Sequence, residues 1–400
     1  MIEIKSKKTY TETNPALPSE RNQVMHHHRN PIHCILPPHI LKQIAANGSE
    51  TQKQMAVDTI NSTTQLRAER LKMTEYRAAF AAQMIQSITG GKERIVYDAQ
   101  NGSSLPGTVI RKEGESPVAD VAVNEAYDGS GATYDLYKNI YNRNSIDNNG
   151  LRLDSTVHYQ RNYDNAFWDG KQMVYGDGDG DLFNRFTIAI DVMGHELTHG
   201  VTQYEASLNY SQQPGALNES MSDVFGSLVK QYSLNQSAAD ADWLIGAGLL
   251  AAGVNGVALR SMKAPGTAYD DRVLGKDPQP AHMKDYVNTI SDNGGVHINS
   301  GIPNHAFYLI ATQIGGNAWD KAGQIWYVTL RDKLKATSNF QDCANLTYQT
   351  AADIFGAGSL EQQAVQKGWA DVGLDATGSG GSTPPPPGCF GSLLKLIGAA

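Results

Sequence analysis

Apolar residues in the second half of the chain recur with a period close to 3.6, the spacing that places side chains on one face of a helix. The pattern predicts helices over 188–202, 216–233, 302–315, 319–335 and 340–356. A run without Pro or Gly from 52 to about 88 predicts another helix, with one candidate break near 61–64. Helices therefore dominate from residue 188 onward.

Shorter runs of β-branched and aromatic residues lie between turn residues in the first half of the chain and predict strands. The strands are expected at 95–97, 108–110 and 157–160, with turns at 101–102 and 128–129. The chain is thus predicted to fold as an α+β protein of two lobes, a β-rich lobe over 51–187 and a mainly α-helical lobe over 188–375. A substrate cleft is expected between the lobes.

Both ends of the chain differ in composition from these lobes. Residues 1–50 are rich in Pro, Asn and basic residues and contain a Pro-Pro pair before a short helical pattern. Residues 376–388 change to Gly, Ser and Pro, which predicts a linker. The segment 389–400 has apolar residues at helical spacing and predicts a short amphipathic tail that begins at Cys389. Docking on the enzyme, membrane contact, partner binding, removal and an unfolded tail are all open for it.

The first chemical motif is His195-Glu196-Leu197-Thr198-His199, in the first predicted helix of the second lobe. Residues four apart lie on one face of a helix, so both imidazoles can bind one metal ion. Glu196 lies to the side, where its carboxylate can take a proton from a metal-bound water. An ordinary amphipathic helix can contain this pattern by chance, so the motif needs support from a further ligand.

A second motif supplies such a ligand, because Glu219 and Asp223 lie four residues apart on another predicted helix. Glu219 is predicted to be the third zinc ligand. Asp223 would accept the free ring N–H of a ligand histidine and fix its orientation, and Asn218 is assigned to the same supporting role. Three protein ligands leave a coordination position for water, as in catalytic zinc sites.

A third motif places His297 after a glycine-rich turn, with Asp292 five residues earlier. Attack of water on a peptide carbonyl produces an oxyanion. A cationic or hydrogen-bonding His297, oriented by Asp292, could stabilise this charge together with a phenol such as Tyr210. On spacing alone, a structural histidine is the more common explanation.

Together these motifs resemble the thermolysin family of metalloproteases, most closely its members with short propeptides. The similarity extends over about 90–373 and includes 175–180, 195–199, 215–219, 260–262 and 294–301. The resemblance implies one zinc ion bound by His195, His199 and Glu219. It also implies that Glu196 is the general base and that Tyr210 and His297 stabilise the oxyanion.

The same resemblance suggests how a substrate is held. Asn165 and Ala166 resemble an edge segment that binds an extended peptide by strand addition. Arg260 would bind the carbonyl that follows the scissile bond. An apolar pocket would favour cleavage before bulky apolar residues, and its walls would be Phe183, Phe186, Val192, Ile245 and Leu259. Core packing explains each of these five side chains equally well.

The chain departs from the family pattern at a double calcium site. The corresponding positions hold Asp191, Lys230, Asp242, Leu244 and Ala247, so two carboxylates remain. Lys230 is expected to pair with Asp191 or Asp242 and replace the metal, and no double calcium site is predicted. The acidic run 177–181 is also predicted to be a turn, because the positions at which a calcium loop needs Gly and Glu are Leu and Ile.

The resemblance to members with short propeptides also implies a function for residues 1–50. In those proteins a segment with a Pro-Pro motif covers the active-site cleft and is removed on maturation, and 36–41 is similar. The cut is expected in the polar stretch 47–51. Cys34 could block the zinc as a thiolate, although a single cysteine is more often a small buried hydrophobe.

Composition limits the partners. A formal net charge of −8 argues against nucleic acid, and no apolar run reaches the ~20 residues of a membrane-spanning helix. The first residues show no secretory signal pattern, so cytoplasmic synthesis is expected, with non-classical secretion as one exit route. Peptides or proteins are the expected substrates, and the propeptide is the expected intramolecular inhibitor. A separate inhibitor protein is a candidate partner of an enzyme that is expected to be monomeric.

The predicted function is therefore a zinc endopeptidase made as a self-inhibited precursor. A catalytically silent binding protein on the same fold and a zinc exopeptidase are the alternatives. An exopeptidase would need a charged residue dedicated to the substrate terminus, and the sequence identifies none. Binding of an extended strand in an open cleft favours internal cleavage.

Overall fold

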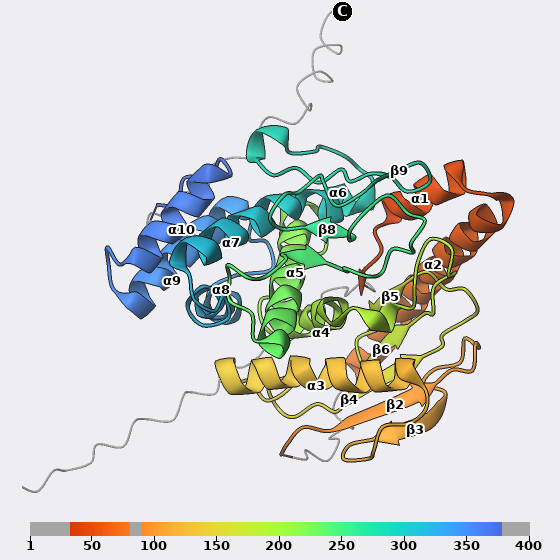
Figure 1. Cartoon of the computed structure of the whole chain (residues 1–400). Coiled ribbons are helices and arrows are strands. Elements are labelled where there is room, and N and C mark those ends of the chain that lie inside the picture. Colours follow the sequence, from red (N-terminus) through yellow and green to blue (C-terminus); the bar gives the residue numbers. More distant parts are fainter. Residues whose placement is uncertain (1–32, 81–89, 378–400) are drawn as a thin grey trace, which may run out of the picture.

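The computed structural model describes residues 33–80 and 90–377 (Figure 1). Residues 1–32 of the predicted propeptide lie outside the described residues, as do the last part of the predicted helix at 81–88, the predicted linker from 378 and the tail with Cys389. Among the helices in the described ranges, none has the length and apolar character needed to cross a membrane.

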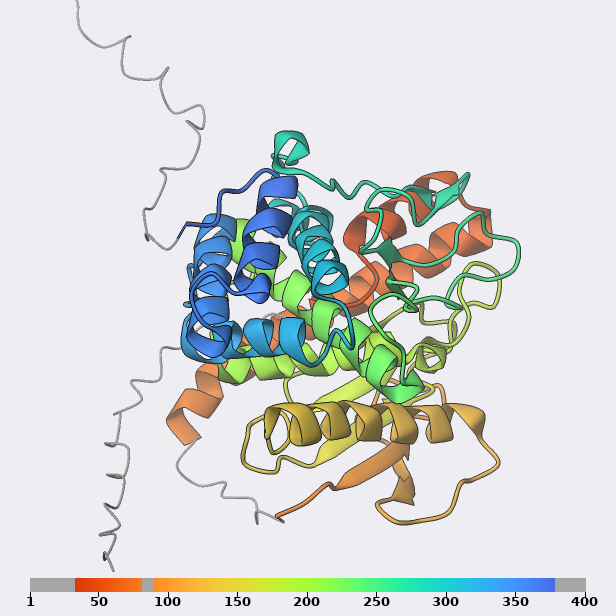
Figure 2. The ribbon, with the colours of Figure 1, turned by 60° about the vertical axis from the view of Figure 1, so that its left-hand side comes forward.

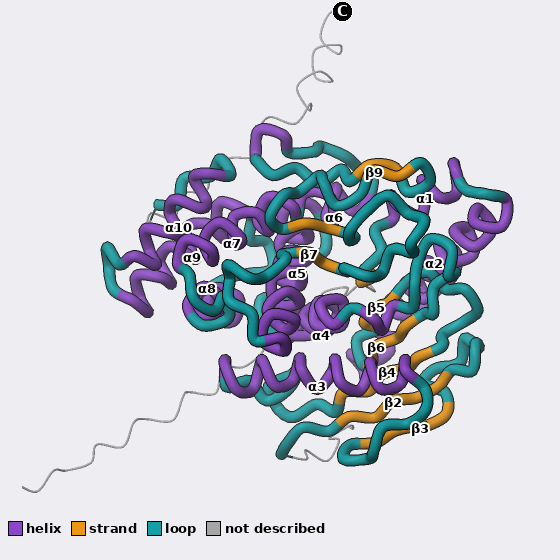
Figure 3. The backbone as a smooth tube through the Cα atoms, viewed as in Figure 1, coloured by secondary structure: helices purple, strands orange, loops and turns teal. Residues whose placement is uncertain are grey.

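The first lobe is built on a six-stranded sheet with the order β1-β5-β6-β4-β2-β3 (Figure 3). The strands are β1 (His33–Cys34), β2 (Arg94–Asp98), β3 (Thr108–Lys112), β4 (Leu153–Val157), β5 (Ala166–Trp168) and β6 (Gln172–Tyr175). The predicted strands at 95–97 and 108–110 lie within β2 and β3. The strand predicted at 157–160 is wrong, because β4 ends at Val157 and the next residue, His158, has a φ of 53° that leaves the strand.

The turn predicted at 128–129 is also wrong, because these residues lie inside helix α3 (Val121–Tyr141). Asp120 caps the helix by accepting the backbone N–H of Ala122. Gly129 is needed for close packing, since a Cβ at this position would lie 2.2 Å from the Met193 sulfur. A glycine that usually signals a turn here lets α3 approach the neighbouring helix, and tertiary packing overrides the local signal.

The second lobe is mainly helical, as predicted (Figure 3). Its helices are α4 (Ile190–Tyr204), α5 (Gln212–Leu234), α6 (Asp292–Asn299), α7 (Gly301–Ile314), α8 (Lys321–Asp332), α9 (Phe340–Phe355) and α10 (Leu360–Asp371). The five helices predicted from periodicity overlap α4, α5, α7, α8 and α9, whereas α10 was not predicted. The short pairs β7 (Leu244–Ile245) with β8 (Arg260–Ser261), and β9 (Asp270–Asp271) with β10 (Gly275–Lys276), lie between α5 and α6.

Two N-terminal helices, α1 (Pro38–Asn47) and α2 (Glu50–Phe80), are separated only by Gly48 and Ser49. The break predicted near 61–64 is wrong, because α2 continues through it. Thr63 shares a hydrogen bond of 3.1 Å with the Tyr163 hydroxyl, so this part of α2 packs on the first lobe. Figure 2 shows α2 in orange-red passing behind the green helices.

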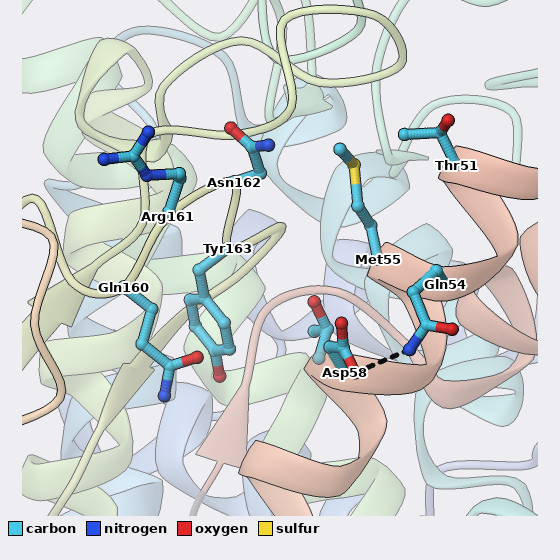
Figure 4. A pocket seen from close by; sticks show the side chains of 9 residues that line it. Thr51, Gln54, Met55, Asp58, Gln160, Arg161, Asn162 and Tyr163 are labelled. Carbon is cyan, nitrogen blue, oxygen red and sulfur yellow. Dashed lines mark hydrogen bonds between the residues drawn. The ribbon is translucent and has the colours of Figure 1, made fainter.

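A pocket of about 280 Å³ lies between the first turns of α2 and the loop at 160–163 (Figure 4). Most of the residues that line it are polar, with Gln54 and Asp58 hydrogen-bonded to each other on the α2 side and Arg161 and Asn162 on the loop side. Tyr163 belongs both to this pocket and to a small buried cluster beneath it.

The two lobes meet at α4 and α5, which pack along each other almost backbone to backbone. A Cβ on Gly226 of α5 would lie 2.4 Å from the Asp191 carbonyl oxygen on α4, and a Cβ on Gly194 would lie 3.0 Å from the Gly226 Cα. Only glycine at these crossings permits such an approach. The predicted metal ligands all lie on this helix pair.

Candidate active site

Helices α4 and α5 bring the three predicted metal ligands together in the interior. His195, His199 and Glu219 each offer one atom to a group in which all atoms lie within 4.8 Å of one another, and all three residues are buried. The Nε2 atoms of the two histidines are 3.0 Å apart. Each lies 3.5 Å from a Glu219 carboxylate oxygen.

The hydrogen bonds behind the ligands indicate that a cation belongs between them. His195 donates its Nδ1–H to Asp223 at 2.7 Å, and His199 donates its Nδ1–H to the Asn218 side-chain oxygen at 2.8 Å. Both Nε2 atoms therefore present lone pairs to each other and to a carboxylate. Glu219 Oε2 is buried and has no hydrogen-bond partner among the described residues. Two imidazole nitrogens and one carboxylate fit the donor set of a catalytic zinc.

Glu196 lies beside this group and is fully buried. Its Oε2 accepts the backbone N–H of Trp168 at 3.1 Å, while Oε1 has no hydrogen-bond partner in the described part of the chain. Burial, with a contribution from the nearby Glu219 charge, raises the pKa of Glu196 well above its usual value. A carboxylate with a raised pKa and one oxygen available is suited to accept and return a proton.

Asp223 connects the metal ligands to the second lobe. Besides His195, it binds the Arg260 guanidinium through both oxygens, at 2.8 and 2.9 Å, and accepts the Asn304 amide at 2.8 Å. Burial alone would raise the pKa of Asp223, but the charge of Arg260 and the hydrogen bonds from Arg260 and His195 lower it below its usual value. Asp223 is thus held as a carboxylate that fixes the orientation of His195.

The glycine-rich turn positions His297 at the other side of the site. Asn293, Gly294 and Gly295 have positive φ values, which bend the chain so that Asp292 receives both the backbone N–H and the Nδ1–H of His297. Burial alone would lower the pKa of His297, but Asp292 and Glu219 raise it above its usual value. His297 Nε2 lies 3.2 Å from the Tyr210 hydroxyl, which itself donates to Glu219.

The N-terminal segment lies against these groups. β1 pairs with β5 in antiparallel fashion, and Ile35 donates its N–H to the Ala166 carbonyl at 3.2 Å. Leu36 donates its N–H to the Asn165 side chain at 3.0 Å. Arg260 donates to the Ile35 carbonyl at 3.2 Å. The three residues assigned to substrate backbone binding thus hold the chain's own segment.

The remaining predicted pocket residues are fully buried. All five belong to the main hydrophobic core, which also contains Ile35 and Leu36: Phe183, Phe186, Val192, Ile245 and Leu259. Their role as pocket walls stays a prediction. The proposed thiolate block by Cys34 does not fit the geometry. Its side chain packs in a separate cluster with Tyr159, Tyr163, Phe167 and Val174, and it is not part of the metal-ligand group.

At the opposite end of α4 and α5, Lys230 lies between two carboxylates. Its ammonium is 2.8 Å from Asp242 and 3.2 Å from Asp191, so it pairs with both rather than with one. Burial alone would lower the pKa of Lys230, but these two carboxylates raise it and keep the ammonium charged. In the acidic run, Asp179 accepts three backbone N–H groups of residues 181–183, which is the pattern of a turn.

Sequence reasoning missed two contributors. Asn304 supports Asp223, and the only signal was a polar residue inside the apolar period of α7. The Trp168 N–H that orients Glu196 is a backbone group, which carries no sequence signal of its own.

Taken together, the fold and the site define a metallopeptidase. Models of the thermolysin family match most of the chain, the thermolysin metallopeptidase catalytic domain at 49–203 and the alpha-helical domain at 206–374. The chain belongs to the thermolysin family of zinc metalloendopeptidases. The predicted family, the two-lobed α+β fold and the zinc peptidase chemistry are therefore confirmed.

Relatives agree with this assignment. An extracellular metalloprotease of Pectobacterium carotovorum is 52% identical over 86% of this chain and 97% of its own length, and Protease PrtS of Photorhabdus sp. is 49% identical over 85% and 91%. Thermolysin of Alicyclobacillus acidocaldarius is 41% identical over 75% of this chain and 54% of its own length. The structure of the precursor of protealysin from Serratia proteamaculans is 54% identical, with a TM-score of 0.78 over 86% of this chain and 99% of that chain.

Proposed function

We propose that the chain is the self-inhibited precursor of a zinc endopeptidase that cleaves before bulky apolar residues. The observation that carries the proposal is the position of Ile35 and Leu36, whose backbones bind Ala166, Asn165 and Arg260 as an extended peptide substrate would. A peptide that adds to β5 in this way is recognised mainly through its backbone. A substrate must therefore displace the segment with Ile35 and Leu36 before it can bind.

Each site residue then has a defined function. His195, His199 and Glu219 hold zinc, which would supply Lewis acidity and an activated water when bound. Glu196 accepts the proton of that water. His297, oriented by Asp292, donates a hydrogen bond to the developing oxyanion, and Tyr210 does so once its single O–H leaves Glu219.

Inhibition is intramolecular. The match to the catalytic-domain model begins at residue 49, next to the Gly48–Ser49 break between α1 and α2, so the covering segment lies upstream of the region that this model matches. His39 on α1 binds the Tyr269 hydroxyl at 3.0 Å and helps to fasten the segment over the site. Removal of residues up to about this break would open the cleft, because β1 and α1 leave together.

The Lys230 ammonium supports a second part of the proposal, that this enzyme has no double calcium site. The positive charge lies within 3.2 Å of both carboxylates that could bind calcium, and it would repel a divalent cation. Stability of this end of the helix pair would then be independent of calcium.

The test is a time course with purified precursor and a Glu196→Gln precursor, followed by intact mass and by cleavage of a peptide library. Wild type should lose the segment up to about residue 48 and cut library peptides before Leu, Ile or Phe, while Glu196→Gln should do neither. Release of single terminal residues only would instead indicate an exopeptidase. A zinc-loaded wild type that cleaves nothing after removal of the segment would favour a silent binding protein.

A further inference from the structure

Two consecutive carbonyl groups of the covering segment meet two different groups of the site. His297 donates its Nε2–H to the Cys34 carbonyl at 3.3 Å. The next carbonyl, that of Ile35, accepts from Arg260 at 3.2 Å. The carbonyl that meets the oxyanion donor is the one that water would attack, so the bond presented to the site is the one between Cys34 and Ile35.

Resting on the proposed function above, we infer that the Cys34–Ile35 peptide bond is a self-cleavage site of the precursor. The segment then acts as a bound substrate and not only as a plug. Its chain direction agrees with this assignment, because Ile35 N–H, Ile35 carbonyl and Leu36 N–H each find a partner in Ala166, Arg260 and Asn165.

The side chains on either side of this bond are both buried. Ile35 is 0% exposed and belongs to the main core, while Cys34 is 2% exposed. Cys34 faces Phe167 across the β1–β5 pair and packs with it in the small cluster whose Tyr163 is held by Thr63 of α2. A bulky apolar residue follows the bond, which is the preference expected of the enzyme. The stretch 47–51, by contrast, reads Asn-Gly-Ser-Glu-Thr and contains no such residue, so the cut near Gly48 should be the slower of the two.

Glu196 is linked to this strand through β5. Trp168 donates its N–H to Glu196 and is the residue of β5 that pairs with His33, directly before Cys34. Hydrolysis adds the oxygen of one water molecule to the Cys34 carbonyl carbon and breaks its bond to the Ile35 nitrogen. Glu196 takes one proton from the water and returns it to that nitrogen, and the second proton of the water also passes to the nitrogen, so the products are a Cys34 carboxylate and an Ile35 ammonium group.

This cut alone does not open the cleft. Ile35 and Leu36 lead directly into α1, so after hydrolysis the residues on the product side stay attached to the enzyme. A tethered product remains at a high effective concentration and continues to inhibit. Full activation then requires a second cut near Gly48, and the species that begins at residue 35 is an intermediate of maturation.

The experiment follows intact mass after zinc is added to precursor purified in a chelator. Wild type should produce a species that spans 35–400, together with a fragment 1–34. Glu196→Gln should produce neither. Cys34→Ser keeps the size of the side chain and should be cut at the same bond, which excludes thiol chemistry. Ile35→Pro removes the N–H that binds Ala166, and the 35–400 species should be lost.

Dilution separates a cut within one molecule from a cut between molecules. The rate of appearance of the 35–400 species should not change over a hundredfold range of precursor concentration. The inference is overturned if wild type matures near Gly48 and cleaves added peptides while the Cys34–Ile35 bond stays intact, or if the rate rises in proportion to concentration. Failure of zinc-loaded, matured enzyme to cleave any added peptide would overturn the proposed function as well.

Discussion

Carboxylates are buried at two places along the α4–α5 helix pair, and a different kind of cation neutralises them at each place. At one end, the carboxylates of Asp191 and Asp242 are neutralised by Lys230, a cation that belongs to the chain. At the other end, Glu196 and Glu219 are buried with two imidazole lone pairs, and one oxygen of each carboxylate lacks a hydrogen-bond partner in the described structure. A side-chain cation closes the first end, whereas the second end needs a metal ion.

The kind of cation determines whether a cluster only stabilises the fold or can also carry out a reaction. An ammonium that is fixed by covalent attachment satisfies its neighbours permanently and leaves no position for a reactant. A metal ion with three protein ligands keeps a position for water. The same two helices can therefore carry a structural contact and a catalytic centre about one to two helical turns apart, since Asp191 lies four residues from His195 and eight from His199 on α4.

The largest effect should come from Glu196, because the cluster around Lys230 contains no residue with a catalytic role. Glu196→Gln keeps the shape of the side chain but removes the proton acceptor, so kcat/KM for a peptide should fall by about 10³-fold or more. Zinc content, measured by atomic absorption, should stay at one ion per chain. Activity in Glu196→Gln would contradict the role of Glu196 as the base, and loss of zinc would contradict the assignment of metal binding to other residues.

Asp223→Asn should be the most destabilising change near the metal. It leaves the buried Arg260 guanidinium without its carboxylate, which should lower the free energy of unfolding by about 3–5 kcal/mol. It also weakens the support of His195, so zinc affinity should fall about 10–100-fold. Chemical denaturation and zinc titration measure the two effects. Asn304→Ala removes only a neutral donor to Asp223 and is the control, with an expected cost of about 1 kcal/mol.

Lys230→Met breaks the other end by leaving Asp191 buried without its cation. We expect the free energy of unfolding to fall by about 2–3 kcal/mol with little change in kcat/KM, because the Lys230 ammonium pairs with Asp191 and Asp242 and not with a metal ligand or Glu196. Lys230→Glu adds a third carboxylate, so its melting temperature should rise on addition of calcium. Wild type should show no such rise, and a calcium-dependent melting temperature in wild type would contradict the replacement of metal by lysine.

Acidification should affect the metal end selectively, through the segment that covers it. Burial and, after it, the charge of His297 lower the pKa of His39 to about 4. Arg260 and Lys42 lower this pKa further, and only Asp292 raises it. A released segment has an ordinary histidine pKa of about 6.5. Docking is therefore fully favourable above pH 6.5 and should weaken as pH falls toward 4, by up to about tenfold per pH unit.

A zinc-binding inhibitor measures this opening, because it can bind the precursor only when the segment leaves. Its apparent affinity for the precursor, divided by that for the mature enzyme at the same pH, should rise as pH falls. His39→Gln should flatten this dependence. An unchanged slope in His39→Gln would assign the pH dependence to another group.

Much of the second lobe was predictable because its signals are local. Periodicity identified α4, α5, α7, α8 and α9, and the His195–His199 spacing identified two ligands on one helix face. Glu219 was predicted by the same argument, strengthened by the family resemblance. These residues lie on regular helices, where sequence spacing translates directly into direction.

The first lobe was predicted less well because packing overrides its local signals. The glycine in α3 that suggested a turn is required by the Met193 side chain, and the strand expected at 157–160 ends where His158 turns to bind Asp120 and Asp177. Contacts such as His297 with Cys34 join residues 263 positions apart. No pattern within a short window can reveal them.

The close crossing at Gly226 also determines where sequence change is tolerated. The metal ligands come from both helices, so the geometry around a bound ion would depend on the distance between α4 and α5. Metal–ligand bonds allow about 0.2 Å of variation, while a single methyl group at position 226 would lie 2.4 Å from the Asp191 carbonyl oxygen and force a larger shift. Gly226→Ala should therefore lose zinc, measurable as metal content, although residue 226 touches neither metal nor substrate. A position that touches neither metal nor substrate thus limits which sequences can keep zinc, because only a hydrogen fits where other residues carry a methyl group or more.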